Sequence, residues 1–300
     1  MPTFASGGNT DLSYMAEVTY GTTPAIPSFQ LLPYSSVTLG EARTEIDDST
    51  RRGDRMRRQK YQGNSQVVGD VVAPLMHGNF DPLLESLFRG AFVANVLKPG
   101  NTVKSLSMER MWNDITLYQL FKGVEVNSLT LAGALDAEVQ ATFNLIGQSS
   151  TDPSATSIDT TPTVVTEKKA FINVGGTIKE GGSLANISSF NINIDNGLNP
   201  NYTWGNRDVA NTSSALIIVT GDIEVYFENA TLMNKFRNGT SSTLQVLFSD
   251  GTNSITLDLN TIQYTVATQD DASADTLTLN MNFEALYNAT DAANIKVTRS

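Results

Sequence analysis

Apolar and polar residues alternate with a period of two along several stretches of the chain. The clearest stretches are 190–194, 255–259 and 277–283. Such alternation is typical of a strand with one buried and one solvated face, so we expect antiparallel sheets. Glycine-containing turn sequences at 195–197 and 249–251 adjoin these stretches. Strands punctuated in this way predict a sandwich or a barrel.

Two short segments show helical spacing instead. The first opens with Asp81 and Pro82, a predicted N-cap and first helical residue, and Gly90 is predicted to close it. The second follows Asn229 and is predicted to end at Gly239. Each would span about two turns, which is too short to persist alone in water. We therefore expect each helix to dock on a sheet.

The two helices belong to a longer pattern that occurs twice. Each helix follows a strand with a Gly-Asp pair, at 69–70 and at 221–222. Each Gly-Asp strand follows a Ser-Ser-hydrophobic strand that contains Ser36 or Ser189. The step from that serine to the aspartate is 34 residues in the first case and 33 in the second. Because order and spacing both repeat, we predict an internal duplication.

A segment rich in Ser, Thr, Asp and Pro separates the two copies, and its composition predicts a linker. We therefore expect a mainly β protein with two tandem sandwich or barrel domains, each carrying one short flanking helix. The predicted divisions are a first domain at 1–147, a linker at 148–166, a second domain at 167–288 and a C-terminal tail at 289–300.

The composition excludes several kinds of chemical site. The 300 residues include 20 basic and 31 acidic side chains, no cysteine and one histidine, His77, for a formal net charge of −11. Without cysteine the chain cannot form disulfides, thiolate zinc sites or iron–sulfur clusters. We find no phosphate-binding loop, nucleophile elbow or calcium loop, and we interpret His77 as an ordinary loop residue. We therefore expect no enzyme activity, no cofactor and no metal.

The N-terminal sequence has neither a basic region nor an apolar core typical of a secretory signal, and the apolar runs are too short for a spanning helix. We therefore expect no membrane association and a cytoplasmic site of synthesis.

One decapeptide departs from the acidic composition. Its basic residues are Arg51, Arg52, Arg55, Arg57, Arg58 and Lys60. An arginine cluster suits phosphates, so a nucleic-acid contact is one interpretation, and a solvated loop is another. We favour a third, in which the segment docks on an acidic face of another copy and the guanidinium groups pair with carboxylates. The acidic excess elsewhere supplies the complementary charge.

Six segments stand out by their order along the chain, at 12–25, 118–129, 178–182, 194–198, 226–232 and 283–287. Together they resemble segments of the tail tube (major tail) proteins of long-tailed, non-contractile bacteriophages. None is a catalytic fingerprint, so the resemblance rests on their order and number. It spans residues 10–288, nearly the whole chain.

The resemblance implies a β-sandwich-like tube domain with one flanking helix, in stacked rings of six domains around a channel for DNA. If both halves are tube domains, three chains complete a ring; if only one is, six are needed. We favour the trimer. The family's tape measure, terminator and distal tail proteins are implied partners, and the virion tail, assembled in the host cytoplasm, is the implied location.

In such a tube, an acidic channel would repel DNA phosphates and let the genome pass without specific binding. The segment 51–60 then becomes a candidate contact between rings.

Two other functions remain open on the residues alone. A carbohydrate-binding or adhesive β-sandwich would expose aromatic side chains such as Trp112, Trp204 and Tyr202, although we expect these three in core or interface packing. A β-rich hydrolase would need a pocket with paired carboxylates. The adjacent pairs at 47–48 and 270–271 are more typical of solvated loops.

Overall fold

The computed structural model describes residues 4–166, 168–270 and 276–300, and the predicted mainly β fold is confirmed. The strands up to residue 150 are β1 (Thr10–Ala16), β2 (Gln30–Leu31), β3 (Ser36–Val37), β4 (Gly40–Asp47), β5 (Lys60–Pro74), β6 (Val96–Leu97), β7 (Leu106–Trp112), β8 (Leu117–Ala134), β9 (Gln140–Gly147) and β10 (Ser149–Ser150). Those that follow are β11 (Thr177–Glu180), β12 (Ser183–Leu184), β13 (Ile187–Asp195), β14 (Leu198–Asn201), β15 (Asn211–Ser214), β16 (Ile218–Tyr226), β17 (Ser242–Ser249), β18 (Ser254–Asp270), β19 (Thr278–Ala285) and β20 (Lys296–Arg299).

The described residues also form two α-helices, α1 (Asp81–Phe88) and α2 (Thr231–Arg237). Short 3-10 turns occupy Gly7–Asn9, Asn113–Ile115 and Asn173–Gly175. Below, the first half is the part of the chain before the 148–166 segment, and the second half is the part after it.

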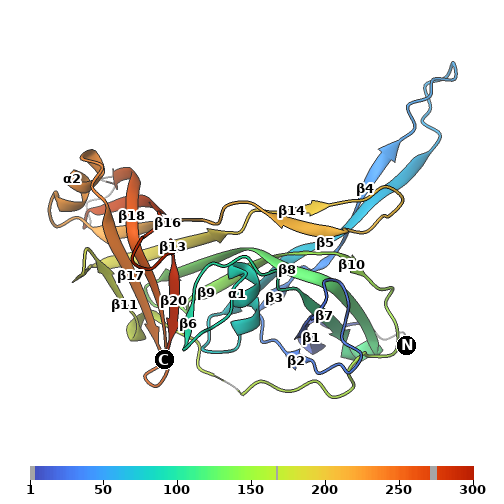
Figure 1. The fold of residues 1–300 in the computed structure, drawn as a ribbon, viewed down its shortest axis with the longest axis horizontal. Helices are drawn as coiled ribbons and strands as arrows, with labels where there is room; N and C mark the ends of the chain where they lie inside the picture. The colour runs from blue at the N-terminus through green and yellow to red at the C-terminus, as the bar shows by residue number, and fades with distance from the viewer. Residues whose placement is uncertain (1–3, 167, 271–275) are drawn as a thin grey trace.

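The long strand β8 organises the first half. Its N-terminal part pairs with β7, and the pairing continues through β1 to β2. Its C-terminal part pairs with β9, and the pairing continues through β5 to β3 and β4. All of these pairings are antiparallel, as predicted. Helix α1 packs against β8, so the two sheets and the helix enclose a core (Figure 1).

The second half repeats this order of pairing around the long strand β18. The N-terminal part of β18 pairs with β17, which leads to β11 and β12. The C-terminal part pairs with β19, which leads to β16 and β13. The pairing with β9 or β19 shifts register at the same place in each long strand, between Val126 and Ser128 in β8 and between Tyr264 and Val266 in β18. Helix α2 packs against β18.

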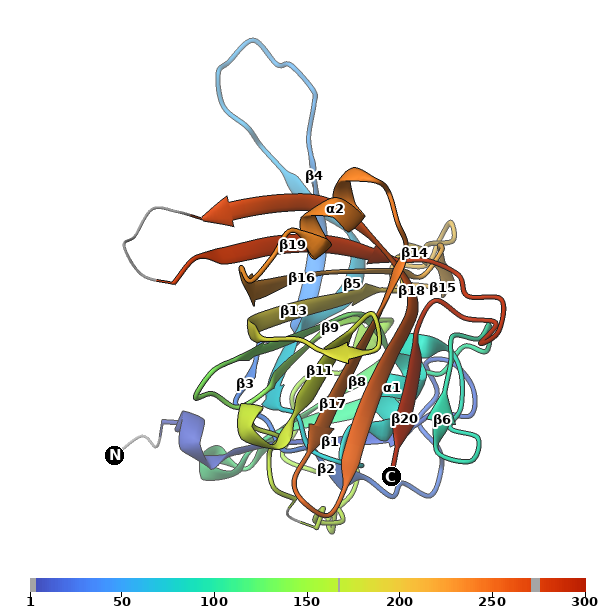
Figure 2. The same ribbon diagram turned by 90° about the vertical axis from the view of Figure 1, so that its left-hand side faces the viewer.

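The longest antiparallel pairing between the two halves, within the described residues, joins β8 and β13. A continuous sheet therefore runs through β4, β5, β9, β8, β13, β16, β19 and β18 (Figure 2). Leu129 and Leu131 of β8 lie opposite Ile194 and Ile192 of β13, and all four side chains are buried. The hydrophobic core is accordingly continuous across the halves.

The glycine of each Gly-Asp pair permits a close approach of the neighbouring strand. A Cβ on Gly69 would lie 2.6 Å from the Cα of Leu39, and a Cβ on Gly221 would lie 2.5 Å from the carbonyl oxygen of Asn191. Such contacts would displace backbone, because real Cβ atoms do not come so close to backbone atoms. Both positions therefore require glycine, at corresponding points of β5 and β16.

The predicted helices are present, but both ends of α1 differ from the prediction: its N-cap is Phe80 and not Asp81, which is the first helical residue. Helix α1 begins at Asp81 with a proline in its first turn, but its C-cap is Arg89, at a left-handed φ of 46°, rather than Gly90. Gly90 is needed for packing instead, since a Cβ there would lie 2.5 Å from the carbonyl oxygen of Lys98. The ends of α2 match the prediction: the side chain of Asn229 accepts the N–H of Thr231 at 2.8 Å, and Gly239 follows the last turn at a φ of 60°.

The 148–166 segment is anchored along the first half. Its β10 pairs with β8, the N–H of Ile158 donates to Glu109 at 2.9 Å, and Asp159 accepts the N–H of Phe29 at 2.8 Å. The C-terminal tail crosses back to the first half, where Val297 of β20 pairs with Leu97 of β6. The division into a linker, two domains and a tail stays a prediction. Within the described ranges, no helix is long and apolar enough to cross a membrane.

Candidate assembly interface

The pairing between β8 and β13 is the structural link between the halves. It joins Ser128–Ala134 to Ser189–Asp195 over seven residue pairs. One face of the link is apolar and belongs to the core. On the opposite face the hydroxyl of Thr130 donates to the side-chain oxygen of Asn193 at 3.2 Å. The link therefore shows how one edge of this fold can bind another.

A hairpin from the second half reinforces the link. Strands β14 and β15 leave the sheet after β13 and lie across the first half beside β5 (Figure 1). Asn127 of β8 holds the base of the hairpin: its backbone carbonyl accepts the N–H of Asn196, and its side-chain oxygen accepts the N–H of Leu198, both at 2.8 Å. Further along, the N–H of Ser65 donates to the carbonyl of Arg207 at 2.9 Å.

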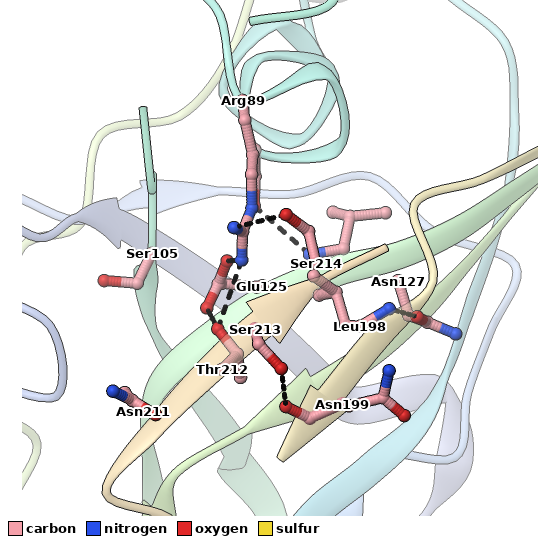
Figure 3. Close-up of polar contacts among 12 residues, drawn as sticks. Arg89, Ser105, Glu125, Asn127, Leu198, Asn199, Asn211, Thr212, Ser213 and Ser214 are labelled. Atoms are coloured by element: carbon pink, nitrogen blue, oxygen red, sulfur yellow. Dashed lines mark hydrogen bonds and ion pairs between the residues drawn. The ribbon is translucent and has the colours of Figure 1, made fainter. Parts of the chain in front are cut away.

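The hairpin covers a buried ion pair (Figure 3). Arg89, at the end of α1, donates to the carboxylate of Glu125 on β8 at 2.8 Å, and the exposed fractions of the two side chains are 7% and 0%. From the hairpin, Ser214 accepts from Arg89 at 2.9 Å, and the hydroxyl of Thr212 donates to Glu125. Burial raises the pKa of the Glu125 carboxyl, and the contacts with Thr212 and Arg89 lower it by less. Groups from both halves thus bond to this charge pair.

In each half, one further carboxylate outside this pair fixes the end of a strand. Glu17, just after β1, accepts the hydroxyls of Ser105 at 2.6 Å and Ser107 at 2.7 Å. Glu180, the last residue of β11, accepts from Lys235 at 2.8 Å and from the hydroxyl of Ser242 at 2.6 Å. The donors come from the chain itself, which is the arrangement of a structural clamp.

Tyr264 donates to Glu180 at 3.0 Å, and burial raises the pKa of its hydroxyl. The described residues contain no group of three or more His, Asp or Glu side chains placed to hold a metal. The imidazole of His77 lies in the connection between β5 and α1, and burial lowers its pKa.

The solvated face of the continuous sheet is acidic. Its acidic residues are Asp70, Asp195, Asp222, Glu224 and Glu284. They alternate with buried apolar residues, so they lie opposite the core. The sequences of β9, β13, β16 and β19, with residues 66–74 of β5 and 125–134 of β8, contain no lysine or arginine. These segments therefore carry acidic and no basic side chains on this face.

The structure places the predicted basic cluster on a projecting arm, formed by the outer parts of β4 and β5 with the loop 48–59 between them (Figures 1 and 2). The residues are all exposed: Arg51, Arg52, Arg55, Arg57, Arg58 and Lys60.

Within this arm, Arg57 pairs with Asp47 at 3.0 Å, Arg58 pairs with Asp54 and Lys60 pairs with Glu45. Among the described residues, no ion pair involves Arg51, Arg52 or Arg55. These three guanidinium groups can therefore meet a partner.

The aromatic residues lie in three different settings. Trp112 packs under the guanidinium of Arg110 at 5.1 Å, and the hydroxyl of Tyr202 bonds to Gln66 at 3.2 Å. Trp204, in the loop between β14 and β15, is fully exposed, so it does not pack in the core of the chain, and its packing at an interface stays a prediction. It lies in the hairpin that covers the first half, with its side chain open to solvent.

The carboxylate pairs offer no support for a hydrolase. Asp47 pairs with Arg57 in the exposed arm, while the side chains of the 270–271 pair lie outside the described residues. A groove of about 270 Å³ between Ile178 and Phe190 is lined by apolar, hydroxyl and amide side chains, without a carboxylate.

Sequence reasoning found the arm but missed the buried ion pair. The arm is a contiguous run of charge, whereas Arg89 and Glu125 are 36 residues apart and Thr212 is 87 residues from Glu125. One local signal could have indicated the ion pair. Glu125 stands between two valines in a strand, and a charged residue buried in such an apolar run is almost always paired.

We find no match to this chain among curated proteins. A family model described as phage tail tube protein matches residues 7–285, nearly the same span as the resemblance seen in the sequence. The predicted family is thus confirmed, and with it a structural role in a phage tail. The chain belongs to the phage tail tube protein family.

Proposed function

We propose that this protein polymerises into stacked rings that form the tube of a phage tail, through which DNA passes during infection. Family membership supplies the structural role in a tail. The observation that carries the ring is the pairing between β8 and β13, which fuses the edges of two similarly ordered halves into one sheet. Repeating that contact between chains would extend the sheet around a ring.

We also propose that the two halves are duplicated tube domains. Four features support this: the order of strand pairing, the position of the register shift, the required glycine of each Gly-Asp pair and a carboxylate clamping one strand end. With two tube domains per chain, a ring of six domains needs three chains. Head-to-tail contacts of this kind close a ring when the rotation permits.

In such a ring, we assign the acidic face of the continuous sheet to the channel. The opposite face packs against the core and the helices, so it cannot line an open channel. Electrostatic repulsion acts over about 8 Å at physiological ionic strength. Phosphates that pass near the wall would therefore be repelled, and the genome could slide without specific binding.

The arm is assigned to contacts between rings. Its strands continue β4 and β5 beyond the part of the sheet that would form the wall (Figure 2). A hairpin that extends wall strands in this way leaves through one face of the ring and reaches the next ring. There its free arginines would meet acidic side chains of another copy, where bidentate pairs are strong.

This role needs no catalysis and no cofactor from the chain. Its partners would be further copies of itself, with the tape measure, terminator and distal tail proteins at defined places along the tail. We place the protein in the virion tail after assembly in the host cytoplasm.

Electron microscopy of the purified protein, with mass measurement of the smallest assemblies, tests the proposal. Stacked rings built from assemblies three times the 32.4 kDa chain mass support it. Rings of six chains would retain the tube but refute the pseudo-hexamer. Monomers that stay dispersed at high concentration would refute the tube and favour an adhesive β-sandwich.

A further inference from the structure

The two halves can be aligned residue by residue through their hydrogen-bonded strands. In the first half Asp70 of β5 pairs with Asn144 of β9, and in the second Asp222 of β16 pairs with Asn282 of β19. On the long strands, Ser128 is the next partner of Asn144 and Val266 the partner of Asn282. Each lies just beyond the register shift, so Ser128 corresponds to Val266.

Counting residues in the same way aligns the strands that pair with the other edges of β5 and β16. The strand partner of Ser36 is the residue two positions after Asp70. The strand partner of Ser189 is likewise the residue two positions after Asp222. Counting along the strands from these serines, Asp195 of β13 corresponds to Ala42 of β4. The strand that binds the edge of β8 inside the chain therefore has its counterpart in β4.

Both counterparts are open edges. Within the described part of the chain, β4 pairs with β5 alone, and β18 beyond residue 262 pairs with β19 alone. Val266 is an apolar residue with 44% of its surface exposed. Unpaired strand edges present free N–H and C=O groups, and these groups bind another strand readily.

We propose that residues 266–269 of β18 in one copy pair antiparallel with residues 39–42 of β4 in the next copy, in the register of the internal link. Val266 then lies opposite Ala42, Ala267 opposite Glu41, and Thr268 opposite Gly40. This inference rests on the proposed ring and names its closing contact. Every copy carries one edge of each kind, so the contact is head-to-tail and three copies can close it.

A groove next to β3, the strand that precedes β4, supports pairing with the same partner. It measures about 240 Å³ and is lined by Ser36, Val37 and Trp112 among others. The corresponding groove beside β13 is lined partly by Val139, which precedes β9. By the same count Val139 corresponds to Leu277, and Leu277 is 36% exposed while Val139 is 2% exposed. Leu277 of a neighbouring copy would cover the groove as Val139 does within the chain.

The contact between copies is expected to be weaker than the internal link. On the core face, the internal link contributes Leu129 and Leu131, whereas β18 offers Ala267 and Gln269 at the corresponding positions. Less apolar surface is buried, so less free energy is gained. Such a contact suits subunits that fold first and associate later.

Disulfide trapping tests the register, because the natural chain contains no cysteine. One preparation carries Ala42→Cys, another carries Val266→Cys, and the two are mixed under assembly conditions and oxidised. Directly opposed residues of an antiparallel pair have Cα atoms about 4.5 to 5.5 Å apart, within the range a disulfide spans. The matched control replaces Val266→Cys with Thr268→Cys, which moves the thiol two residues out of register, to about 7–8 Å.

The expected result is a covalent dimer in the mixture of Ala42→Cys and Val266→Cys, at least several-fold more abundant than in the control. A chain with both substitutions should give a cross-linked species of three chains. Tubes that form while the in-register pair cross-links no better than the control would overturn this pairing and leave the proposed function standing. Failure of the unsubstituted chain to form rings would overturn both.

Discussion

Arg89 and Glu125 form an ion pair of 2.8 Å in a place from which water is almost entirely excluded, and a hairpin from the other half of the chain completes it. Thr212 donates to the carboxylate and Ser214 accepts from the guanidinium. The pair therefore couples the two halves through polar contacts, next to the apolar contacts of the β8–β13 link.

Removing one partner of this pair should destabilise the fold strongly. In Glu125→Ala the buried guanidinium of Arg89 would lose its counter-charge, and such losses cost about 3–5 kcal/mol. We expect the midpoint of urea unfolding, followed by circular dichroism, to fall accordingly.

A double replacement separates the charge effect from packing. Arg89→Met with Glu125→Leu removes both charges and retains apolar volume, so much of the lost stability should return. A Glu125→Ala variant within about 0.5 kcal/mol of the natural chain would contradict this account of the pair.

The alternation of apolar and polar residues was sufficient to predict the strands that have one buried and one solvated face. Phe190, Ile192 and Ile194 alternate with polar residues, and β13 contains all three as buried side chains. The same pattern could not show that β18 continues to residue 270, because residues 265–269 are mostly exposed and have no apolar face. Nor could it show the partner of β13, since periodicity fixes the buried face of a strand but not its neighbour.

Of the candidate interface, too, the sequence predicted one part and not another. The basic arm was found because its charges are contiguous and need no fold to bring them together. The β14–β15 hairpin was missed because β14 is only Leu198–Asn201 and contains Pro200, which is unfavourable within a strand. Its contacts with Asn127 and Arg89 exist only because β8 and β13 pair.

Truncating the apolar side of the link should also destabilise the chain. Ile194 is fully buried opposite Leu129, so Ile194→Ala leaves a cavity in the shared core. Changes of this type cost about 2–5 kcal/mol. Leu216→Ala is the matched control, because Leu216 is 83% exposed and its truncation should change the free energy of unfolding by less than about 0.5 kcal/mol. Equal effects of the two substitutions would show that the link contributes no special packing.

Asp250 should make the stability of the fold depend on pH. Its carboxylate accepts the N–H groups of Asn253 at 2.7 Å and Thr252 at 2.8 Å, and these bonds lower its pKa to about 2 in the folded chain. The unfolded chain, with an ordinary aspartate pKa of about 3.9, binds the proton more readily between those values. The stabilisation is therefore complete above pH 4 and is lost as the pH falls towards 2.

In Asp250→Asn this contribution to the pH dependence should disappear. Thermal unfolding at pH 4, 3 and 2 measures it: the fall in Tm should be smaller for Asp250→Asn than for the natural chain. Asp152→Asn, at an exposed position in the 148–166 segment, is the control and should retain the natural slope. The idea fails if the two variants lose Tm in parallel.

The arm should be required for stacking and not for folding. Arg51, Arg52 and Arg55 are exposed and make no ion pair among the described residues, so their replacement by serine breaks no internal ion pair. We expect the triple variant to fold and to form rings, but to lose most of the material that sediments as tubes at physiological salt. Natural tubes should weaken in the same direction at 1 M salt, where the screening length falls to about 3 Å.

A charge-matched variant decides whether position or net charge matters. Lys169, Lys179 and Arg237 are exposed elsewhere on the chain, and their replacement by serine removes the same three positive charges. This variant should sediment as the natural protein does, because its arm is intact. If both triple variants lose tubes equally, net charge governs stacking, and if neither does, the arm is a solvated loop. Only selective loss in the arm variant is consistent with guanidinium groups that meet carboxylates of the next ring.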